Sequence, residues 1–209
     1  MFPRGAYKAL RLERSAVIMS AVRFSQSVIE HNRNRYPEAR WPTSSAYRLP
    51  LRDDSVDACF SMYVLDHLVC PEKILDEMLR VTKKGGHAIL LFPDFLRPGR
   101  FVSQQAGFGF GTAKEKLKQG TLPDTVVTFY DNRLRFPKML KRLKRRIGGF
   151  TVHLQPACLY YPNMAHPDFD AVYIASKAEV MNWAIRQGYG VYLPKGVQGL
   201  FKDHAFVVI

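Results

Sequence analysis

The sequence predicts an α/β fold with a Rossmann-like, mostly parallel sheet and flanking helices. Between residues 56 and 92, two apolar segments of strand length enclose one segment with helical periodicity, an order that is typical of a βαβ unit. The chain has 209 residues, of which 47% are hydrophobic and 23% charged, so it can form a core and is not a disordered chain. Its longest apolar run is much shorter than the roughly 18 residues that cross a bilayer.

The first part of the chain predicts a strand, a helix and a weaker strand. The apolar run Ala16–Val22 suits a buried strand. Ser25 can cap a helix over Gln26–Arg35, which must end before Pro37 because proline disfavours helical geometry in the residue before it. A weak strand candidate follows at Ala39–Thr43.

The βαβ unit comes next. Val56–Met62 is apolar enough for a buried strand, and Pro71 opens a helix. Apolar residues on one face of that helix are Ile74, Leu75, Met78, Leu79 and Val81. We expect Lys83–Gly86, basic residues followed by glycines, to end the helix. His87–Phe92 is the clearest strand of the chain.

A basic, aromatic segment, 96–170, interrupts this alternation and predicts an insert or cap within a single domain, 1–209. Residues 96–150 hold 13 Lys/Arg and 3 Asp/Glu, whereas the whole chain has a net charge of +13. Their densest part, 138–147, predicts an amphipathic helix that stops at Gly148 and Gly149, with Met139, Leu140, Leu143 and Ile147 on one face. This helix either contacts an anionic membrane surface or another polyanion, or packs on its own domain. No signature of a nucleic-acid-binding module is present, so we do not expect nucleic acid as a partner.

After the insert, the alternation returns with the apolar segment Ala171–Ala175. Ser176 can cap a helix over Lys177–Gln187 that stops at Gly188, and Val191–Leu193 and Ala205–Ile209 predict the final strands. Three scattered cysteines (Cys59, Cys70, Cys158) predict neither a disulfide framework nor a metal site. We therefore expect a reduced, cytoplasmic setting, at the periphery of a membrane if the basic helix binds lipid.

A series of short motifs between residues 49 and 86 is more specific than any of these patterns. In order, it reads Leu49-Pro50-Leu51, Asp53-Asp54-Ser55-Val56-Asp57, Val64-Leu65-Asp66-His67-Leu68, Pro71-Glu72-Lys73-Ile74-Leu75, Glu77-Met78-Leu79-Arg80-Val81 and Lys84-Gly85-Gly86. The series resembles the class I S-adenosylmethionine (SAM)-dependent methyltransferases, in particular the methyltransferase type 11 group. Taken singly, each piece also has a plain reading, with Glu77 and Arg80 only decorating a helix.

The resemblance implies SAM as cofactor and assigns residues around it by position. Ser61, Met62 and Tyr63, at the end of the predicted strand 56–62, would line the cofactor site, and Met62 and Tyr63 could equally be core residues. Arg23 stands where the family usually has an acidic residue that binds the ribose. Ser45 and Ala46 stand where the family usually has Asp-Ala near the adenine.

His67 is the one candidate base in the matched region, and its alternative is a half-buried structural histidine. Other side chains that could face a substrate lie in or after the insert: Tyr130, His153, Tyr160, Tyr161 and His166. The aromatic residues and positive charge of the insert indicate an anionic or amphiphilic small-molecule methyl acceptor.

The family's opening strand and G-x-G-x-G loop have no counterpart before Ser25. The single G-x-G-x-G, Gly107–Gly111, follows no strand directly, so we expect a flexible aromatic loop there. The sequence therefore predicts a SAM-dependent methyltransferase that is truncated at its N-terminus. Two alternatives remain open: a non-catalytic binding or scaffolding protein with a methyltransferase-like fold, and a peripheral membrane- or polyanion-binding module.

Overall fold

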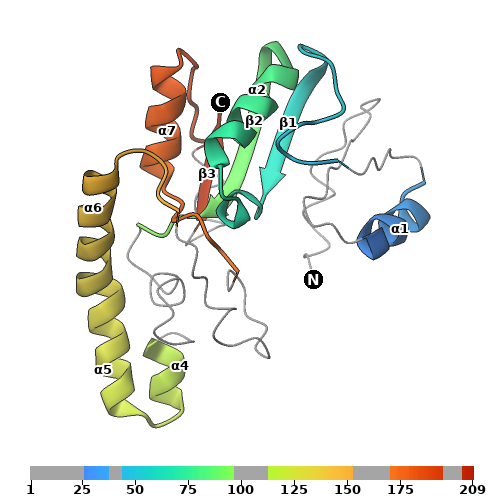
Figure 1. Cartoon of the computed structure of the whole chain (residues 1–209). Coiled ribbons are helices and arrows are strands. Elements are labelled where there is room, and N and C mark those ends of the chain that lie inside the picture. Colours follow the sequence, from blue (N-terminus) through green and yellow to red (C-terminus); the bar gives the residue numbers. More distant parts are fainter. Residues whose placement is uncertain (1–25, 38–43, 97–112, 153–169, 195–203) are drawn as a thin grey trace. The chain divides into compact units, whose positions relative to one another are not determined.

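The computed structural model describes residues 26–37, 44–96, 113–152, 170–194 and 204–209 (Figure 1). The chain forms two compact units, 1–50 and 51–209, which are described separately here. The single domain 1–209 with an insert at 96–170 stays a prediction. Three predicted features lie outside the described residues: the strands Ala16–Val22 and Ala39–Thr43, and the glycine loop Gly107–Gly111.

The first unit contains helix α1, Gln26–Arg35, which confirms the helix predicted from Ser25 and Pro37. Arg33 and Arg35 lie in its last turn, where cations interact favourably with the helix dipole. Further along, a tight turn joins Ser45 to Arg48, whose N–H donates to the Ser45 carbonyl at 3.0 Å.

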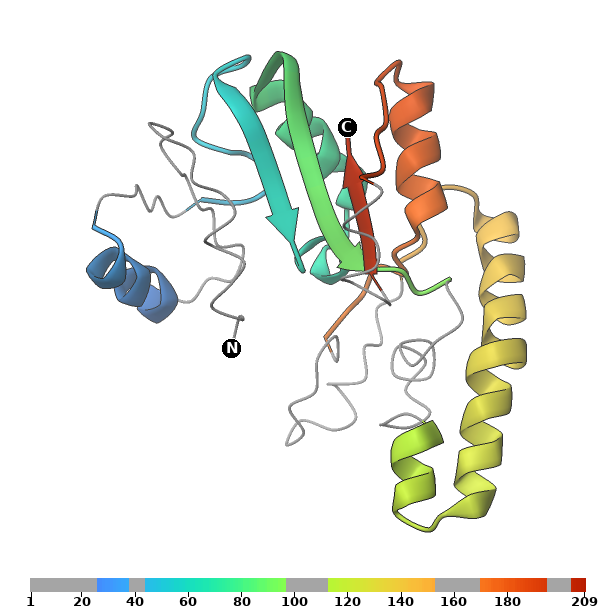
Figure 2. The same cartoon turned by 180° about the vertical axis from the view of Figure 1, so that it is seen from behind.

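The second unit is built on a three-stranded mixed sheet in the order β1-β2-β3 (Figure 2). Strand β1, Val56–Met62, pairs in parallel with β2, Thr82–Pro93, and β2 pairs in antiparallel with β3, His204–Val208. Helix α2, Pro71–Val81, carries the chain from β1 back to the start of β2. The α/β class and the βαβ unit are thus confirmed, with one parallel and one antiparallel pairing in the described sheet. The burial predicted for Val56–Met62 is wrong: no residue of β1 is buried and Phe60 is 41% exposed, because β1 is an edge strand of the described sheet.

Helix α2 packs on one face of the sheet through the face that the sequence predicts. Ile74, Leu75, Met78 and Val81 are buried, whereas Leu79 is partly exposed. Burying four such side chains contributes roughly 1.5–3 kcal/mol each relative to exposing them, which fixes the helix to the sheet. The buried residues Leu90, Leu91 and Phe92 of β2 lie at the centre of the core.

The glycine pair does not end α2, which is a correction to the sequence reading. The helix already ends at Val81, and Lys83–Gly86 belong to β2. In the parallel register, Val56 faces Thr82, whereas Ala58 faces His87, so these residues form a bulge. Gly86 is required there because a Cβ atom would lie 2.6 Å from the Asp57 carbonyl oxygen.

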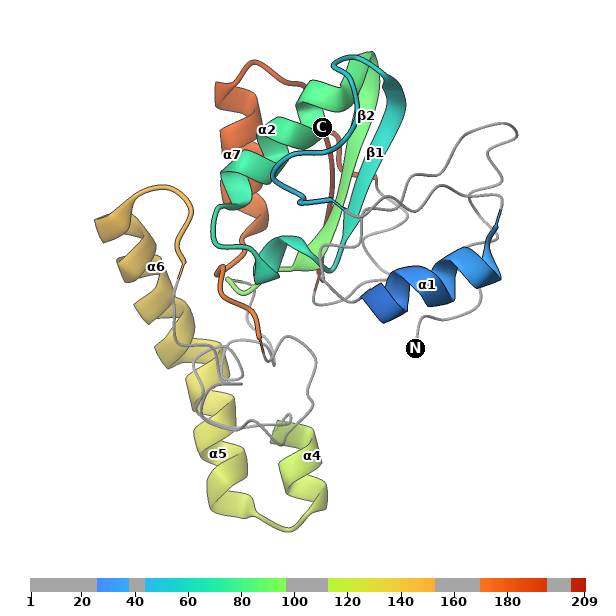
Figure 3. The ribbon, with the colours of Figure 1, turned by 45° about the vertical axis from the view of Figure 1, so that its right-hand side comes forward.

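The described part of the insert is a helical hairpin (Figure 3). Helix α4, Ala113–Lys118, packs beside α5, Leu122–Tyr130, which continues through a π-helical turn, η2, Asp131–Arg135, into α6, Phe136–Ile147. The predicted basic helix is therefore confirmed as α6.

The predicted apolar face is confirmed in part. Leu140 is buried and Leu143 is partly exposed, whereas Met139 is 45% exposed. Phe136, which the prediction did not include, is buried at the start of the helix. Gly148 and Gly149 end α6 with φ of +68° and +70°, a geometry that favours glycine.

Residues 171–175 are not a strand, which corrects another expectation. Their backbone N–H groups go to different segments instead of one neighbouring strand: those of Val172 and Tyr173 donate to the Asp66 carbonyl, and that of Ile174 to the Thr151 carbonyl. In this segment the structure shows one isolated β-bridge, between Val152 and Tyr173. The segment is a connector between the 3₁₀ helix η1, Leu65–His67, and the end of the insert.

The C-terminal elements follow the prediction more closely. Helix α7, Lys177–Arg186, begins after Ser176, although the Ser176 side chain makes no capping hydrogen bond, and Gly188 at φ +84° follows its end. The predicted strand Val191–Leu193 reduces to one bridge between Tyr192 and Val208. Strand β3 confirms the last predicted strand within a residue at each end.

We expect Gly86→Ala to destabilise the protein by about 1–3 kcal/mol, the usual cost of overpacking, because the new methyl group meets the backbone of β1. The matched control is Gly190→Ala, where an added Cβ has no neighbour within 4 Å. Urea unfolding of both variants measures the difference. Equal midpoints for the two variants would contradict the close approach at Gly86.

Candidate functional site

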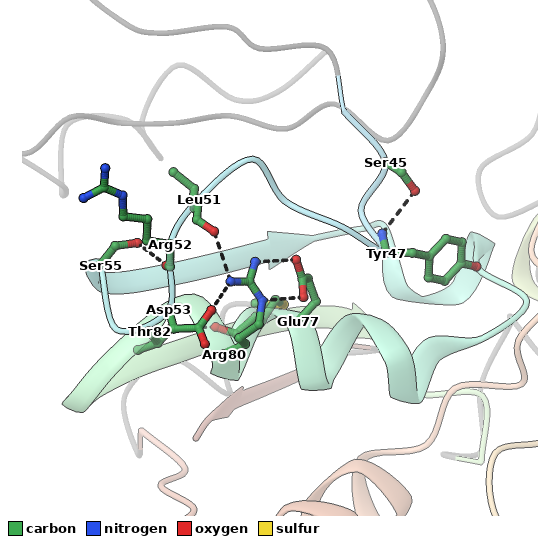
Figure 4. A network of polar contacts seen from close by, with 10 residues as sticks. Ser45, Tyr47, Leu51, Arg52, Asp53, Ser55, Glu77, Arg80 and Thr82 are labelled. Atoms are coloured by element: carbon green, nitrogen blue, oxygen red, sulfur yellow. Dashed lines mark hydrogen bonds and ion pairs between the residues drawn. The ribbon is translucent and has the colours of Figure 1, made fainter.

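Arg80 ties the segment before β1 to the end of α2 (Figure 4). Its guanidinium donates to both carboxylate oxygens of Glu77, at 2.6 and 2.8 Å, to the Leu51 carbonyl at 3.0 Å, and to the Asp53 carboxylate. These hydrogen bonds, first the one to Glu77, raise the pKa of Arg80 above its usual range. Glu77 and Arg80 therefore do more than decorate a helix, because they connect three of the sequence motifs.

Backbone hydrogen bonds brace the same end of the sheet. The N–H groups of Asp54 and Ser55 donate to the carbonyls of Arg80 and Val81, at 3.0 and 2.9 Å. The Ser55 hydroxyl donates to the Arg52 carbonyl at 2.6 Å. All of these groups lie at the amino ends of β1 and β2, so most of the motif series builds the scaffold and leaves the opposite edge for chemistry.

The carboxyl end of β1 carries the strained residue of the site. Tyr63, directly after β1, has φ +55°, a conformation that costs a non-glycine residue roughly 1–3 kcal/mol and clusters at functional sites. Its N–H donates to the Leu91 carbonyl at 2.8 Å, and its ring meets His204 edge-on at 5.1 Å between centroids. In open α/β sheets, ligands bind outside the carboxyl ends of the strands, which is where this pair lies.

His67 lies in the short 3₁₀ helix η1, Leu65–His67, beyond the same edge. Its Nδ1 lies 3.1 Å from Asp170 Oδ1, and its Nε2 lies 3.4 Å from Asp66 Oδ2. The Asp66 side chain is fully buried, the Asp170 side chain is 41% exposed, and the imidazole is 23% exposed. The imidazole thus lies between a fully buried carboxylate and a more accessible one.

The structure brings part of the predicted site together. Ser61, Met62 and Tyr63 end β1, and His67 follows in η1 of the same unit. Ser45 and Ala46 lie in the first unit, where the Ser45 hydroxyl oxygen accepts the N–H of Tyr47 at 3.2 Å. Arg23 lies outside the described residues.

Sequence reasoning missed three further residues at this edge: Asp66, Asp170 and His204. Asp66 stands inside a quoted motif, but nothing in its spacing distinguishes it from a helix-capping acid. Asp170 and His204 are distant in sequence and reach His67 and Tyr63 only through the fold. Of the weaker candidates, Tyr130 is exposed on α5, and His153, Tyr160, Tyr161 and His166 lie outside the described residues.

No metal cluster is found in the described part of the chain, and Cys59 there is not a reactive thiol. No group of three or more His, Cys, Asp or Glu residues there could hold a metal ion. Burial raises the pKa of the Cys59 thiol to about 11, so Cys59 is protonated at neutral pH and is a poor nucleophile. Likewise, no helix among the described residues is long and apolar enough to cross a membrane.

A buried ion pair fastens the insert near the carboxyl end of β2. Lys144 of α6 donates to Glu179 of α7 at 2.6 Å, and the Tyr173 hydroxyl donates to the same carboxylate at 2.7 Å. Burial lowers the pKa of Lys144, which the ion pair opposes, and burial together with Glu179 raises the pKa of Tyr173. Asp94, the residue after β2, also acts electrostatically on both groups.

Comparisons with known proteins agree with the motif series. Residues 5–90 match a family model described as a methyltransferase domain, which confirms the resemblance to the methyltransferase type 11 group. The chain is 47% identical over 55 residues to an uncharacterized methyltransferase of Mycolicibacterium vanbaalenii, and 44% identical over 62 residues to one of Mycobacteroides abscessus. These matches cover 26% and 30% of this chain, but the chain spans only 22% and 24% of the relatives' lengths.

Among solved structures, the fold is similar to that of a SAM-dependent methyltransferase from Mesorhizobium loti. The TM-score is 0.49 at 11% sequence identity, over 93% of this chain and 79% of that one.

We expect Glu179→Gln to destabilise the protein by about 3 kcal/mol, because it leaves the Lys144 ammonium buried without its counter-charge. Asp76→Asn, which removes an exposed carboxylate of α2, is the control and should change stability by less than about 0.5 kcal/mol. Thermal and urea unfolding measure both. A Glu179→Gln protein as stable as the control would show that the ion pair does not hold the insert.

Proposed function

We propose that the protein is a SAM-dependent methyltransferase, with its reaction centre at the carboxyl end of β1 and β2. The observation that carries the proposal is the strained Tyr63 at the end of a parallel strand, within a βαβ unit whose sequence matches a methyltransferase domain. Tyr63 retains this strain at the edge where this kind of sheet binds ligands. The other described non-glycine residue with positive φ, Asp54 at +50°, lies in the turn before β1, where Asp tolerates this conformation.

The residues at that edge fit a nucleoside cofactor with a sulfonium group. A nucleoside site needs apolar and aromatic walls with a few well-placed polar groups. Met62 and Tyr63 supply the apolar and aromatic walls, and Ser61 supplies a hydroxyl group. All three side chains are partly exposed. SAM, when bound, supplies the methyl group for in-line transfer to a nucleophile. The chain's own contribution is to hold and orient the two reactants, which accounts for much of the rate in such transfers.

His67 is the candidate base where the nucleophile carries a proton. Buried Asp66 orients the imidazole through Nε2, as the second group of a base–orienter pair does. Nδ1 faces Asp170, whose side chain is 41% exposed, so a substrate hydroxyl or amine could take the place of this carboxylate and give its proton to Nδ1. This assignment makes Asp66 a positioning residue.

The methyl acceptor that the charge favours is an anionic or amphiphilic small molecule. The insert, whose described helices carry most of the exposed cations, is anchored beside Asp94 at the end of β2 by Lys144 and Glu179. Cations placed near a reaction centre raise the local concentration of anionic substrates. Substrate selection by the insert is thus a part of the proposal.

Photolabelling with methyl-tritiated SAM tests the site, because a covalent label also reports weak binding. We expect label in the peptide that contains residues 61–67, and suppression of that label by excess S-adenosylhomocysteine. Tyr63→Ala should lower the labelling about fivefold or more, equivalent to about 1 kcal/mol of binding.

Tyr189→Ala is the matched control, since it removes a partly exposed aromatic side chain beyond α7. Its labelling should equal that of the wild type. Label that is scattered over the chain, or that S-adenosylhomocysteine does not suppress, would contradict the proposal and favour the non-catalytic alternative.

A further inference from the structure

Helix α5 has the reverse of the ordinary surface-helix pattern, because its apolar side chains face solvent and its polar ones are buried. Its apolar side chains, together with one from η2, are between 47% and 67% exposed: Leu122, Val126, Val127, Phe129, Tyr130 and Leu134. Polar side chains occupy the inner side, where Thr128, Asp131 and Asn132 are buried. A surface helix normally places its apolar stripe toward the core and its polar residues toward water.

Specific contacts hold the polar side inward. Lys116 of α4 donates to the Thr128 hydroxyl at 2.8 Å, and Arg135 pairs with Asp131 at 3.3 Å. The Lys116 contact joins α4 to α5, so rotating α5 to hide its apolar side would break it, whereas the Asp131–Arg135 pair lies within η2 and neutralises the buried carboxylate there. The outward apolar face is therefore built into the hairpin.

The rod formed by α5, η2 and α6 keeps one inner side along its length. Its inner positions recur every four residues: Thr128, Asn132, Phe136, Leu140 and Lys144. An α-helix has 3.6 residues per turn, so such a spacing would drift around the helix. The π-helical turn η2, which has wider i to i+5 hydrogen bonding, offsets that drift. The outer side thus continues from α5 into α6.

Along this outer side the chemistry changes from apolar to cationic. The exposed basic residues of α6 are Lys138, Lys141, Arg142, Arg145 and Arg146. Over the whole hairpin, residues 113–147, there are 11 Lys/Arg against three Asp/Glu, a net charge of +8. Exposed apolar residues in contiguous patches mark binding surfaces. The adjacent positive charge indicates that the partner is anionic.

We propose that this hairpin docks on an anionic lipid bilayer, with the outer side of α5 inserted at the headgroup–acyl boundary and the cations of α6 over acidic headgroups. Amphipathic helices that bind membrane interfaces combine these two features. A second copy of the chain would bring another charge of +8 to the same surface, which opposes self-association. Nucleic acid would meet the cations but would leave the six large apolar side chains without a partner.

The surface differs from the one that the sequence indicates. The basic stretch 138–147 supplies electrostatic attraction. Among its residues of described burial, Met139 is the one exposed large apolar side chain, which is too little to anchor the helix. The apolar anchor lies instead in α5. There the guanidinium of Arg133 lies over the ring of Phe129, 5.7 Å from the ring centroid. This inference does not rest on methyl transfer, so it can hold or fail independently of the proposed function.

Vesicle flotation of the full chain tests the proposal. We expect binding to phosphatidylcholine vesicles that contain about 30% phosphatidylserine, weak binding to phosphatidylcholine alone, and weaker binding as salt rises, because surface charge is screened. The double variant Phe129→Ser/Tyr130→Ser should lower the bound fraction about fivefold or more, since it removes the insertion of apolar side chains.

Two control variants lie on α7. Ile185→Ser removes an exposed apolar side chain, and Arg186→Gln removes an exposed cation; neither should change binding. Arg142→Gln/Arg145→Gln should lower binding to anionic vesicles while retaining the weak binding to neutral ones. Circular dichroism confirms that each variant is folded.

Several outcomes would overturn the proposal. Binding to neither vesicle, or unchanged binding of the Phe129→Ser/Tyr130→Ser variant, would remove the apolar anchor. Equal losses in the Ile185→Ser control would show a nonspecific effect. A dimer in sedimentation equilibrium that the Phe129→Ser/Tyr130→Ser variant no longer forms would assign the surface to a second copy of the chain. Two results together would assign it to nucleic acid: RNA displaces the wild-type chain from vesicles, and the Phe129→Ser/Tyr130→Ser variant still binds RNA.

Discussion

β1 and β2 run in the same direction, so the chain must return between them, and α2 is the helix that makes this return. Two consequences follow from the parallel pairing. The amino ends of both strands meet at one edge, where Arg80 holds the turn before β1 against the end of α2. The carboxyl ends meet at the opposite edge, where Tyr63 and the segment after β2 are brought together. If β1 and β2 were antiparallel, the carboxyl end of one strand would lie beside the amino end of the other. Tyr63 would then lose its neighbour His204.

Most of the motif series therefore lies at the amino ends of β1 and β2, whereas the candidate site lies at their carboxyl ends. Glu77, Arg80 and Gly86 are recognisable in sequence because each meets a geometric demand: a bidentate ion pair, a carbonyl contact and a space too small for a Cβ atom. Tyr63 and His67 occupy the edge that the scaffold leaves open, and there the fold adds Asp170 and His204. The insert is fastened to this same side by Lys144 and Glu179. If the insert selects the substrate and docks on a membrane, as proposed, both roles depend on this one ion pair.

How much the sequence predicts depends on the kind of signal. Val56–Met62, Pro71–Val81 and the basic helix are local patterns, and the structure confirms each as a strand or a helix. The burial expected of Val56–Met62 is wrong, because β1 has only one neighbouring strand in the described sheet. The strand expected at Ala171–Ala175 is wrong, because β-propensity cannot tell a ladder from a connector whose N–H groups go to several segments. The role of Lys83–Gly86 is also wrong, since a glycine pair marks a bulge as well as a helix end. Of the site, Ser61, Met62, Tyr63 and His67 could be placed by motif, whereas Asp170 and His204 reach it through tertiary contacts alone. The inverted face of α5 depends on partners in α4 and η2 that no periodicity reveals.

Pairwise disulfide trapping tests the parallel pairing most directly, in a background with Cys59→Ala, Cys70→Ser and Cys158→Ser. In the parallel register, Phe60 faces Ile89 and Ala58 faces His87, with Cα atoms about 4.8 Å apart, close enough for a disulfide. Phe60→Cys/Ile89→Cys and Ala58→Cys/His87→Cys should both cross-link rapidly under mild oxidation. The crossed pairs, Phe60→Cys/His87→Cys and Ala58→Cys/Ile89→Cys, should cross-link slowly or not at all. Rapid cross-linking of the crossed pairs and slow cross-linking of the direct ones would mean antiparallel strands and would contradict the account of the site.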